Sequence, residues 1–252
     1  MDQLTHELRL ALDIGNSSTK AGVFRGGELL GPVLRFSSDD WQGIGREATN
    51  RNVDKLIYCS VANVPPPTVI AKWTAGNRRR VYALDPTGPL PFTSRYETPH
   101  TLGQDRLGAV AGAVGLHERR PLLVVDAGSC MTLDFVDASA VYYGGNISPG
   151  LRMRLRAMHD YTARLPLVEP TGQPALLGTT TASALVSGGQ YGMLLEVEGL
   201  YARLLEEHPG LLLLLTGGDA AWLASQINVP FYHYPDLVLR GLNRLLDLYA
   251  EP

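Results

Sequence analysis

The chain has 252 residues, of which 45% are hydrophobic and 19% are charged, a composition typical of globular proteins and not of disordered or fibrous ones. This length allows one large domain or two of ordinary size. The 22 basic and 25 acidic residues give a net charge of -3, which argues against a dedicated nucleic-acid partner.

The two cysteines are too few for a disulfide framework or a four-thiolate zinc site, which indicates a reducing compartment. The first residues carry acids where a secretory signal would carry bases, and no apolar run reaches the roughly 18 to 20 residues of a membrane helix. We therefore expect a soluble, cytoplasmic protein with no membrane partner.

The first half of the chain opens with a predicted β-hairpin. Apolar residues alternate over 8–12, a turn rich in Gly, Asn and Ser follows at 13–20, and apolar residues resume over 21–24. Further on, we expect a strand over 57–61, a proline-rich stretch that excludes a helix interior, a solvated arginine run at 78–80, and a helix over 103–116.

The second half opens in the same way, with a strand over 121–125, a polar turn and a strand over 133–136. The elements expected after it are a Gly-rich turn region at 142–149, a basic helix over 151–159, a long helix from the Thr179–Thr181 cap to Glu207 with Gly188–Gly189 as a possible break, a buried strand over 211–215 and a closing helix over 236–249. Because strands and helices alternate, the fold class is α/β.

The two hairpins also resemble each other. Superposing Asp13 on Asp126 places Gly15 on Gly128 and Thr19 on Thr132. This short repeat suggests two related lobes, over residues 1–118 and 119–252. Small polar residues end three of the strands, the third at Thr216–Asp219, so they can frame a nucleotide cleft between the lobes.

Asp13 follows an apolar strand and precedes a tight polar turn. A carboxylate in this position can hold hydrated magnesium while turn amides, hydroxyls and the Lys20 ammonium face phosphate oxygens. The alternative is a plain hairpin turn whose Asp and Asn bond their own backbone. The chain has neither a P-loop nor a Gly-x-Gly-x-x-Gly motif after a strand.

Four motifs together resemble the type III pantothenate kinases of the actin, sugar-kinase and heat-shock chaperone superfamily. They are Asp-Ile-Gly-Asn-Ser-Ser-Thr-Lys at 13–20, Tyr-Glu-Thr-Pro-His-Thr-Leu-Gly-Gln-Asp-Arg at 96–106, Asp-Ala-Gly-Ser-Cys-Met-Thr at 126–132 and Gly-Gly-Asn-Ile-Ser-Pro-Gly at 144–150. The resemblance covers nearly the whole chain and implies the actin-like, ribonuclease H-like ATPase fold with two duplicated lobes. Thr179 departs from the pattern, since a basic residue is usual there.

The resemblance implies ATP-dependent phosphorylation of pantothenate to 4'-phosphopantothenate, the first step of coenzyme A biosynthesis, by a homodimer. It makes Asp105 the catalytic base and assigns Mg²⁺ to Asp13, directly or through water, and a monovalent cation, K⁺ or NH₄⁺, to Asp126. The implied ATP-binding residues are Asp13, Ile14, Gly15, Asn16, Ser17, Ser18, Thr19, Lys20 and Ser129. The implied pantothenate-binding residues are Tyr96, Gly103, Gln104, Asp105, Arg106 and Thr181.

Two other functions remain open at this point. One is a kinase of another small alcohol, since phosphate turns are shared across the superfamily. The other is a nucleotide-binding accessory or regulatory protein of the same fold, although the chain has no spare basic DNA-reading module. The joint presence of Asp13, Lys20, Asp105, Arg106 and Asp126 favours an active enzyme.

Overall fold

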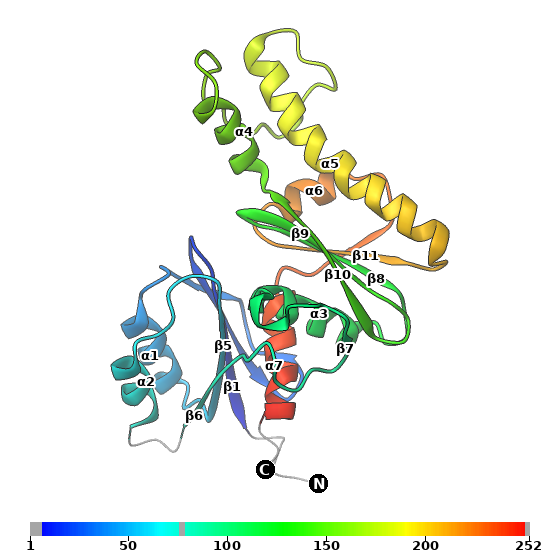
Figure 1. The fold of residues 1–252 in the computed structure, drawn as a ribbon. Coiled ribbons are helices and arrows are strands. Elements are labelled where there is room, and N and C mark those ends of the chain that lie inside the picture. The colour runs from blue at the N-terminus through cyan, green and yellow to red at the C-terminus, as the bar shows by residue number, and fades with distance from the viewer. Residues whose placement is uncertain (1–6, 76–78, 250–252) are drawn as a thin grey trace. The chain divides into compact units, whose positions relative to one another are not determined.

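The computed structural model of the chain describes residues 7–75 and 79–249. It contains two compact units, each with its own sheet (Figure 1). The first unit comprises the chain up to Glu118 together with the residues from Asp236 onward, and the second comprises Arg119–Pro235. The closing segment thus lies in the first unit, whereas we expected it in the second lobe.

The first unit is built on a mixed sheet whose strands are ordered β3-β2-β1-β5-β6, with β4 paired to β2. β1 is antiparallel to β2 and parallel to β5, which is parallel to β6. The elements of this unit are β1 (Leu8–Ile14), β2 (Thr19–Arg25), β3 (Glu28–Leu29), β4 (Leu34–Phe36), α1 (Trp41–Asn50), β5 (Lys55–Ser60), α2 (Pro67–Thr74), β6 (Arg80–Ala83), β7 (Thr93–Ser94), the short 3₁₀ helix η1 (Pro99–Thr101), α3 (Gln104–Leu116) and α7 (Leu237–Tyr249).

Helices cover both faces of this sheet: α1 and α2 lie on one face, and α3 and α7 lie on the other (Figure 1). This sandwich explains why β1 reads as a nearly continuous apolar run, since strands covered on both faces bury every side chain. α3 buries the nine consecutive residues from Arg106 to Val114, so it is covered on every side along this stretch.

α7 belongs to the first unit because its backbone packs directly against α3. A Cβ atom on Gly241 would lie 1.8 Å from the carbonyl oxygen of Gly108, and one on Gly112 would lie 2.4 Å from that of Leu237. Only glycine allows two helices to approach this closely. The helix that starts with the predicted site residues therefore packs directly against the last helix of the chain, on the same face of the sheet.

The arginine run does not form a solvated loop throughout. Arg79 is buried, and its guanidinium donates hydrogen bonds to the carbonyl oxygens of Ala48, Val53 and Trp73 at 2.8–3.0 Å. Arg80 begins β6, and Arg78 lies outside the described residues. Five donors in a rigid fork suit Arg79 to join three backbone segments, so its role is structural.

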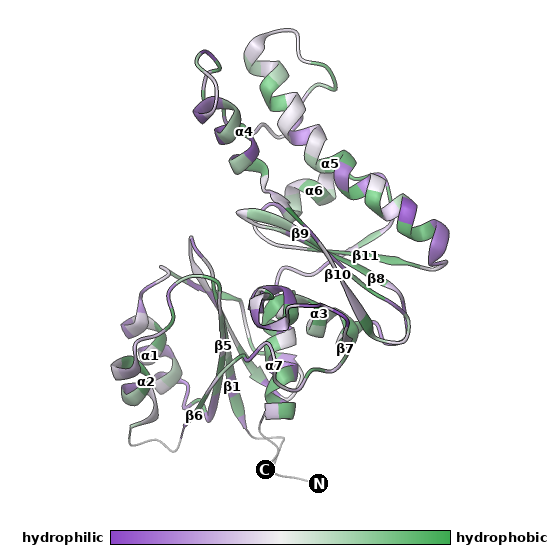
Figure 2. Ribbon diagram, in the orientation of Figure 1, coloured by the Kyte–Doolittle hydropathy of each residue, from purple (hydrophilic) through white to green (hydrophobic). Residues whose placement is uncertain are grey.

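The strands that belong to the second unit are ordered β12-β11-β8-β9-β10. This order repeats the pattern of the first unit, with an antiparallel hairpin, β8 and β9, beside the parallel strands β11 and β12. The elements of this unit are β8 (Leu122–Ala127), β9 (Cys130–Val136), β10 (Val141–Pro149), α4 (Leu151–Asp160), α5 (Thr181–Glu207), β11 (Leu212–Thr216), α6 (Ala220–Gln226) and β12 (Phe231–His233). β8 and β11 are hydrophobic over most of their length (Figure 2) and form a core with α5 and α6.

Two expectations for this unit were wrong. The Gly-rich stretch at 142–149 is strand β10 and not a turn, because a Cβ atom on Gly145 would lie 1.8 Å from the carbonyl oxygen of Leu133 on β9. Glycine thus allows the close pairing. α5 runs without a break through Gly188–Gly189. Glycine at position 189 serves packing, because a Cβ atom there would lie 2.6 Å from the Leu155 side chain of α4. Among the described residues, none of the helices combines the length and apolar character that crossing a membrane requires.

Candidate functional site

The predicted phosphate turn connects β1 to β2 and is closed by a hydrogen bond from Gly15 N–H to Ser18 O at 3.1 Å. Asp13 pairs with Lys20 across the two strands, so their side chains share one face of the sheet. Nζ of Lys20 lies 3.9 Å from Oδ2 of Asp13. The turn therefore combines a carboxylate, a cation and backbone N–H groups within a few residues.

Strand alternation turns two other residues of this motif to the opposite face. Ile14 is buried in the core against α1 and α2, and Thr19 is fully enclosed. The Thr19 hydroxyl has no hydrogen-bond partner among the described residues. A ligand bound at this turn could therefore contact the backbone of Ile14 and Thr19 but not their side chains. The motif alone did not indicate this.

Cys59 is a neighbour of Asp13 that the sequence reasoning missed. β5 pairs with β1 so that the two residues lie side by side, with Sγ 3.7 Å from Oδ1 of Asp13. Burial, reinforced by the charges of Asp13 and Asp105, holds the pKa of the Cys59 thiol well above its usual value. Cys59 is therefore a neutral thiol, and no motif in the sequence could have marked it.

The first turn of α3 brings the predicted base to the same part of the unit. Burial raises the pKa of Asp13, the Lys20 ammonium opposes that shift, and the negative charge of Asp105 adds to it. The Asp105 carboxylate is therefore close enough for its charge to act on Asp13. The Asp105 side chain folds back on its helix, with Oδ1 accepting a hydrogen bond from Arg106 N–H at 2.8 Å.

Arg106 is not a solvated arginine. Its side chain is buried, and its guanidinium carbon lies 5.6 Å from the centre of the Tyr96 ring. Tyr96 and Arg106 thus form one cluster beside Asp105. Gln104 directs its amide to the ends of β5 and β6.

Within the first unit, then, the structure brings together Asp13, Lys20, Cys59 and Asp105. Within the described part of the chain, no group of three or more His, Cys, Asp or Glu side chains is gathered to hold a metal. Mg²⁺ commonly needs only one or two carboxylates beside water and substrate phosphates, so Asp13 fits that use.

The second unit presents the matching hairpin. Asp126 lies near the end of β8 and pairs with Thr132 on β9 and with Thr216 on β11. A Cβ atom on Gly217, whose φ is +100°, would lie 2.5 Å from Oδ1 of Asp126. Glycine therefore lets the backbone after β11 approach the carboxylate, giving a carboxylate and peptide groups of the kind that hard cations bind.

Ser129 is exposed at the tip of this hairpin. Its carbonyl oxygen accepts a hydrogen bond from Gly150 N–H at 3.1 Å, and a Cβ atom on Gly150 would collide with the backbone of Gly128 and Ser129. The start of α4 thus braces the hairpin. Ser129 keeps its hydroxyl at the surface, where a ligand can reach it.

Thr181 is not near the hairpin. It is the exposed first residue of α5, whose N-cap is Thr180 with a capping box to Ser183. In Figure 1 the first turn of α5 lies far from the β8–β9 hairpin. Thr179, which stands where a basic residue is usual in the motif, donates its backbone N–H to Ser183 Oγ at 3.0 Å.

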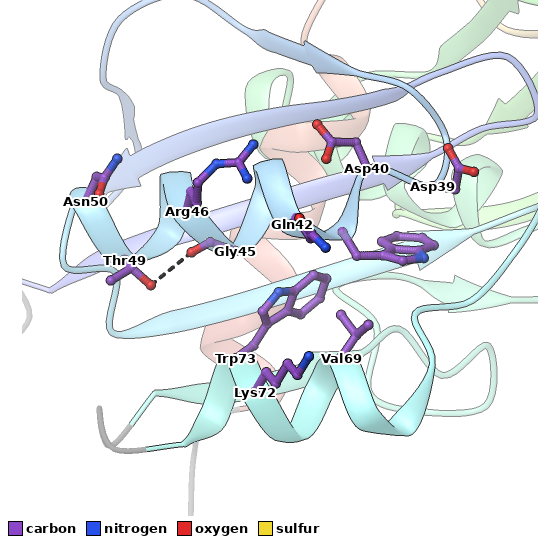
Figure 3. A pocket seen from close by; sticks show the side chains of 11 residues that line it. Asp39, Asp40, Gln42, Gly45, Arg46, Thr49, Asn50, Val69, Lys72 and Trp73 are labelled. Atoms are coloured by element: carbon purple, nitrogen blue, oxygen red, sulfur yellow. Dashed lines mark hydrogen bonds between the residues drawn. The ribbon is translucent and has the colours of Figure 1, made fainter.

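A separate cavity of about 700 Å³ lies between α1 and α2 (Figure 3). Trp41 and Trp73 pack edge to face there with ring centres 6.3 Å apart, and Arg46 and Lys72 border the cavity. None of the predicted site residues lines it, and it lies on the face of the sheet opposite to α3.

Two units with this hairpin pattern, each with an aspartate near the end of its first strand, define the two-lobed α/β nucleotide-binding fold of the actin-like and sugar-kinase class. A structure described as a putative 2-dehydro-3-deoxygalactonokinase protein from Sinorhizobium meliloti matches 96% of this chain and 100% of its own with a TM-score of 0.56 at 16% identity. A structure described as a putative Baf family transcriptional activator from Campylobacter jejuni matches 96% of this chain and 98% of its own with a TM-score of 0.59 at 23% identity.

Sequence comparison is more specific. The profile of type III pantothenate kinases matches residues 9–203. The type III pantothenate kinase of Phocaeicola vulgatus is 37% identical over 240 residues, covering 95% of this chain and 98% of that protein, and that of Bacteroides fragilis is 36% identical over 247 residues with the same coverage. The chain belongs to the type III pantothenate kinase family.

Proposed function

We propose that the chain transfers the terminal phosphoryl group of ATP to the hydroxyl of pantothenate, giving 4'-phosphopantothenate for coenzyme A biosynthesis. The observation that carries this function is the gathering of Asp13, Lys20 and Asp105 in one unit of a chain that belongs to this family. Phosphoryl transfer needs chiefly positioning, charge neutralisation and one base.

In the proposed reaction, Asp105 accepts the proton of the attacking hydroxyl, and the freed oxygen attacks the terminal phosphorus of ATP as the bond to ADP breaks. Lys20 and the backbone N–H groups of residues 16–18 hold phosphate oxygens, and Ser129 contacts the nucleotide. Mg²⁺, when bound beside Asp13, neutralises phosphate charge.

The acceptor and the second cation use other residues. Arg106, held over the Tyr96 ring, supplies a fixed cation for anionic oxygens of pantothenate, and Tyr96 covers its apolar part. Asp126 holds K⁺ or NH₄⁺ at the end of β8. This assignment is supported by the Gly217 backbone, which lies close enough to the Asp126 carboxylate for both to contact one cation.

We also propose that the protein works in the cytoplasm as a homodimer. Large apolar side chains are exposed around the start of α5, among them Leu176 and Leu177 with 66% and 81% of their surface accessible. Such a concentration is typical of surfaces that other chains cover. Thr181 follows these residues, so a second copy seated there would lie beside it.

The direct test is an ATP-consumption assay of the purified protein with pantothenate and with a panel of sugars, each in sodium, potassium and ammonium salts. We expect turnover with pantothenate and dependence on potassium or ammonium, which Asp126→Ala should abolish together with most of the activity. Turnover with a sugar would indicate a different alcohol kinase. Nucleotide binding without turnover of any acceptor would indicate an accessory protein.

A further inference from the structure

We propose that Gln104 is a positioning residue: its side-chain amide clamps the first turn of α3 to the ends of β5 and β6 and thereby fixes Asp105. The inference rests on the proposed function, in which Asp105 is the base. It departs from the role that the family motif implies for Gln104, which is contact with the substrate.

Two hydrogen bonds form the clamp. Oε1 of Gln104 accepts the backbone N–H of Ser60 at 2.8 Å, and Nε2 donates to the carbonyl oxygen of Leu84 at 2.7 Å. Ser60 is the last residue of β5, and Leu84 directly follows β6. Leu84 N–H in turn donates to Tyr58 O at 2.8 Å, so the two strand ends are already joined.

The clamp reaches both acids of the site. Gln104 is the first residue of α3 and Asp105 is the second, so fixing one side chain to the sheet fixes the backbone from which the other extends. Ser60 follows Cys59, which lies beside Asp13 in the strand register. A single amide therefore sets the spacing between the helix that carries Asp105 and β5, the strand that pairs with the Asp13 strand β1.

The contacts leave the amide little to offer a substrate. A glutamine amide has one carbonyl oxygen and two N–H donors, and here the oxygen and one donor engage backbone atoms at good distances. α3 also has no side-chain N-cap, since Gly103 occupies that position. The Gln104 clamp supplies the anchoring at this end of the helix that a cap would otherwise give.

The first arm of the test needs no substrate. Amide hydrogen exchange of Ser60 should be at least about tenfold faster in Gln104→Met, which keeps the length but removes both hydrogen bonds, than in the wild type. Gln190→Met is the matched control, because Oε1 and Nε2 of Gln190 bond the N–H and carbonyl of Thr171 at 3.0 and 2.8 Å in the second unit. Gln190→Met should accelerate amide hydrogen exchange at Thr171 and leave the exchange rate at Ser60 unchanged.

The second arm is kinetic. Gln104→Met should lower kcat by about 10- to 100-fold, because a displacement of about 1 Å can cost that much, with both Michaelis constants within about threefold of wild type. In an Asp105→Asn background it should cause no further loss, since it acts through the base. Gln190→Met should retain the wild-type kcat.

Unchanged exchange at Ser60 would overturn the proposal, as would a raised Michaelis constant for pantothenate with kcat retained, or an additive loss in the double variant. If Gln104→Met does not fold, Gln104→Asn, one methylene too short to reach both partners, takes its place. A wild-type protein inactive on pantothenate would contradict the proposed function, whereas the exchange rates would still decide whether the clamp exists.

Discussion

Gly103 lies so close to Asp105 that a Cβ atom on it would stand 2.6 Å from Oδ1 of the Asp105 carboxylate. The backbone of Gly103, with φ −56° and ψ 129°, is one that any residue can adopt. Glycine is therefore needed here for space and not for conformation, and it determines where the proposed base can point.

We expect Gly103→Ala to displace the Asp105 carboxylate and lower kcat by about 10- to 100-fold while the melting temperature stays close to that of the wild type. Gly199→Ala is the control, because nothing lies within 4 Å of its added methyl group in α5, and it should be stabilising by about 0.5–1 kcal/mol at full activity. Full activity of Gly103→Ala would contradict the assigned position of the base.

Asp105→Asn should lower turnover by about 10²- to 10⁴-fold, because the amide keeps the shape of the side chain but cannot accept the hydroxyl proton. Nucleotide binding, measured by calorimetry, should change little. Wild-type turnover in this variant would show that another group is the base.

Thr19→Val should leave the Michaelis constant for ATP unchanged and raise the free energy of unfolding by up to about 1 kcal/mol, because it removes an enclosed hydroxyl that lacks a partner among the described residues. Urea unfolding and initial rates measure the two effects. Thr74→Val removes a hydroxyl that donates to Ile70 O at 3.1 Å, so it should not raise the free energy of unfolding. A raised Michaelis constant for ATP would mean that the Thr19 hydroxyl reaches the nucleotide.

Glu7 should make stability depend on pH. Burial alone would raise its pKa, but hydrogen bonds from Lys55 and Arg9 outweigh burial and lower the pKa below the ordinary 4.5. A depressed acid pKa contributes stability above the unfolded value and loses it as pH falls through the folded value. Glu7→Gln should thus lower the free energy of unfolding by about 1–3 kcal/mol at pH 7, and the difference should shrink below about pH 4.5.

The control for Glu7 is Glu118→Gln, whose partner Arg244 is 3.9 Å away and whose side chain is largely exposed. Exposed pairs contribute little, so this variant should follow the wild type at every pH. A difference between Glu7→Gln and wild type that does not vary with pH would exclude ionisation as its cause.

Thr181→Val should raise the Michaelis constant for pantothenate by about 5- to 150-fold, the equivalent of the roughly 1 to 3 kcal/mol lost when a substrate polar group is left unpaired. The Michaelis constant for ATP should change little. Equal effects on both substrates, or none on pantothenate, would remove Thr181 from the acceptor site.

Much of the fold could be predicted because its signals are local. The strand, polar turn and strand of each hairpin, and the helical spacing of α3, depend on residues that are neighbours in sequence. α2 is harder to predict because prolines exclude a helix interior but not a helix start: Pro67 is the first residue of α2, where its missing N–H costs nothing.

The remaining features depend on contacts between distant segments. Arg79 is buried because three carbonyl groups converge on it, and its position in an arginine run gives no sign of that. Cys59 becomes a neighbour of Asp13 only through the register of β5 on β1. The motifs could indicate which residues matter, but not that Thr19 faces the core or that Gln104 binds the sheet.

The glycine contact between α3 and α7 has a consequence for biosynthesis. Gly108 and Gly241 belong to the same unit, yet the ribosome makes the whole of Arg119–Pro235 between them, which takes on the order of ten seconds. A nascent chain can close its second sheet before the helix bearing Asp105 has its final neighbour. Truncated products that end before Leu237 would therefore have an exposed face on α3, and activity would begin only when the last helix has left the ribosome.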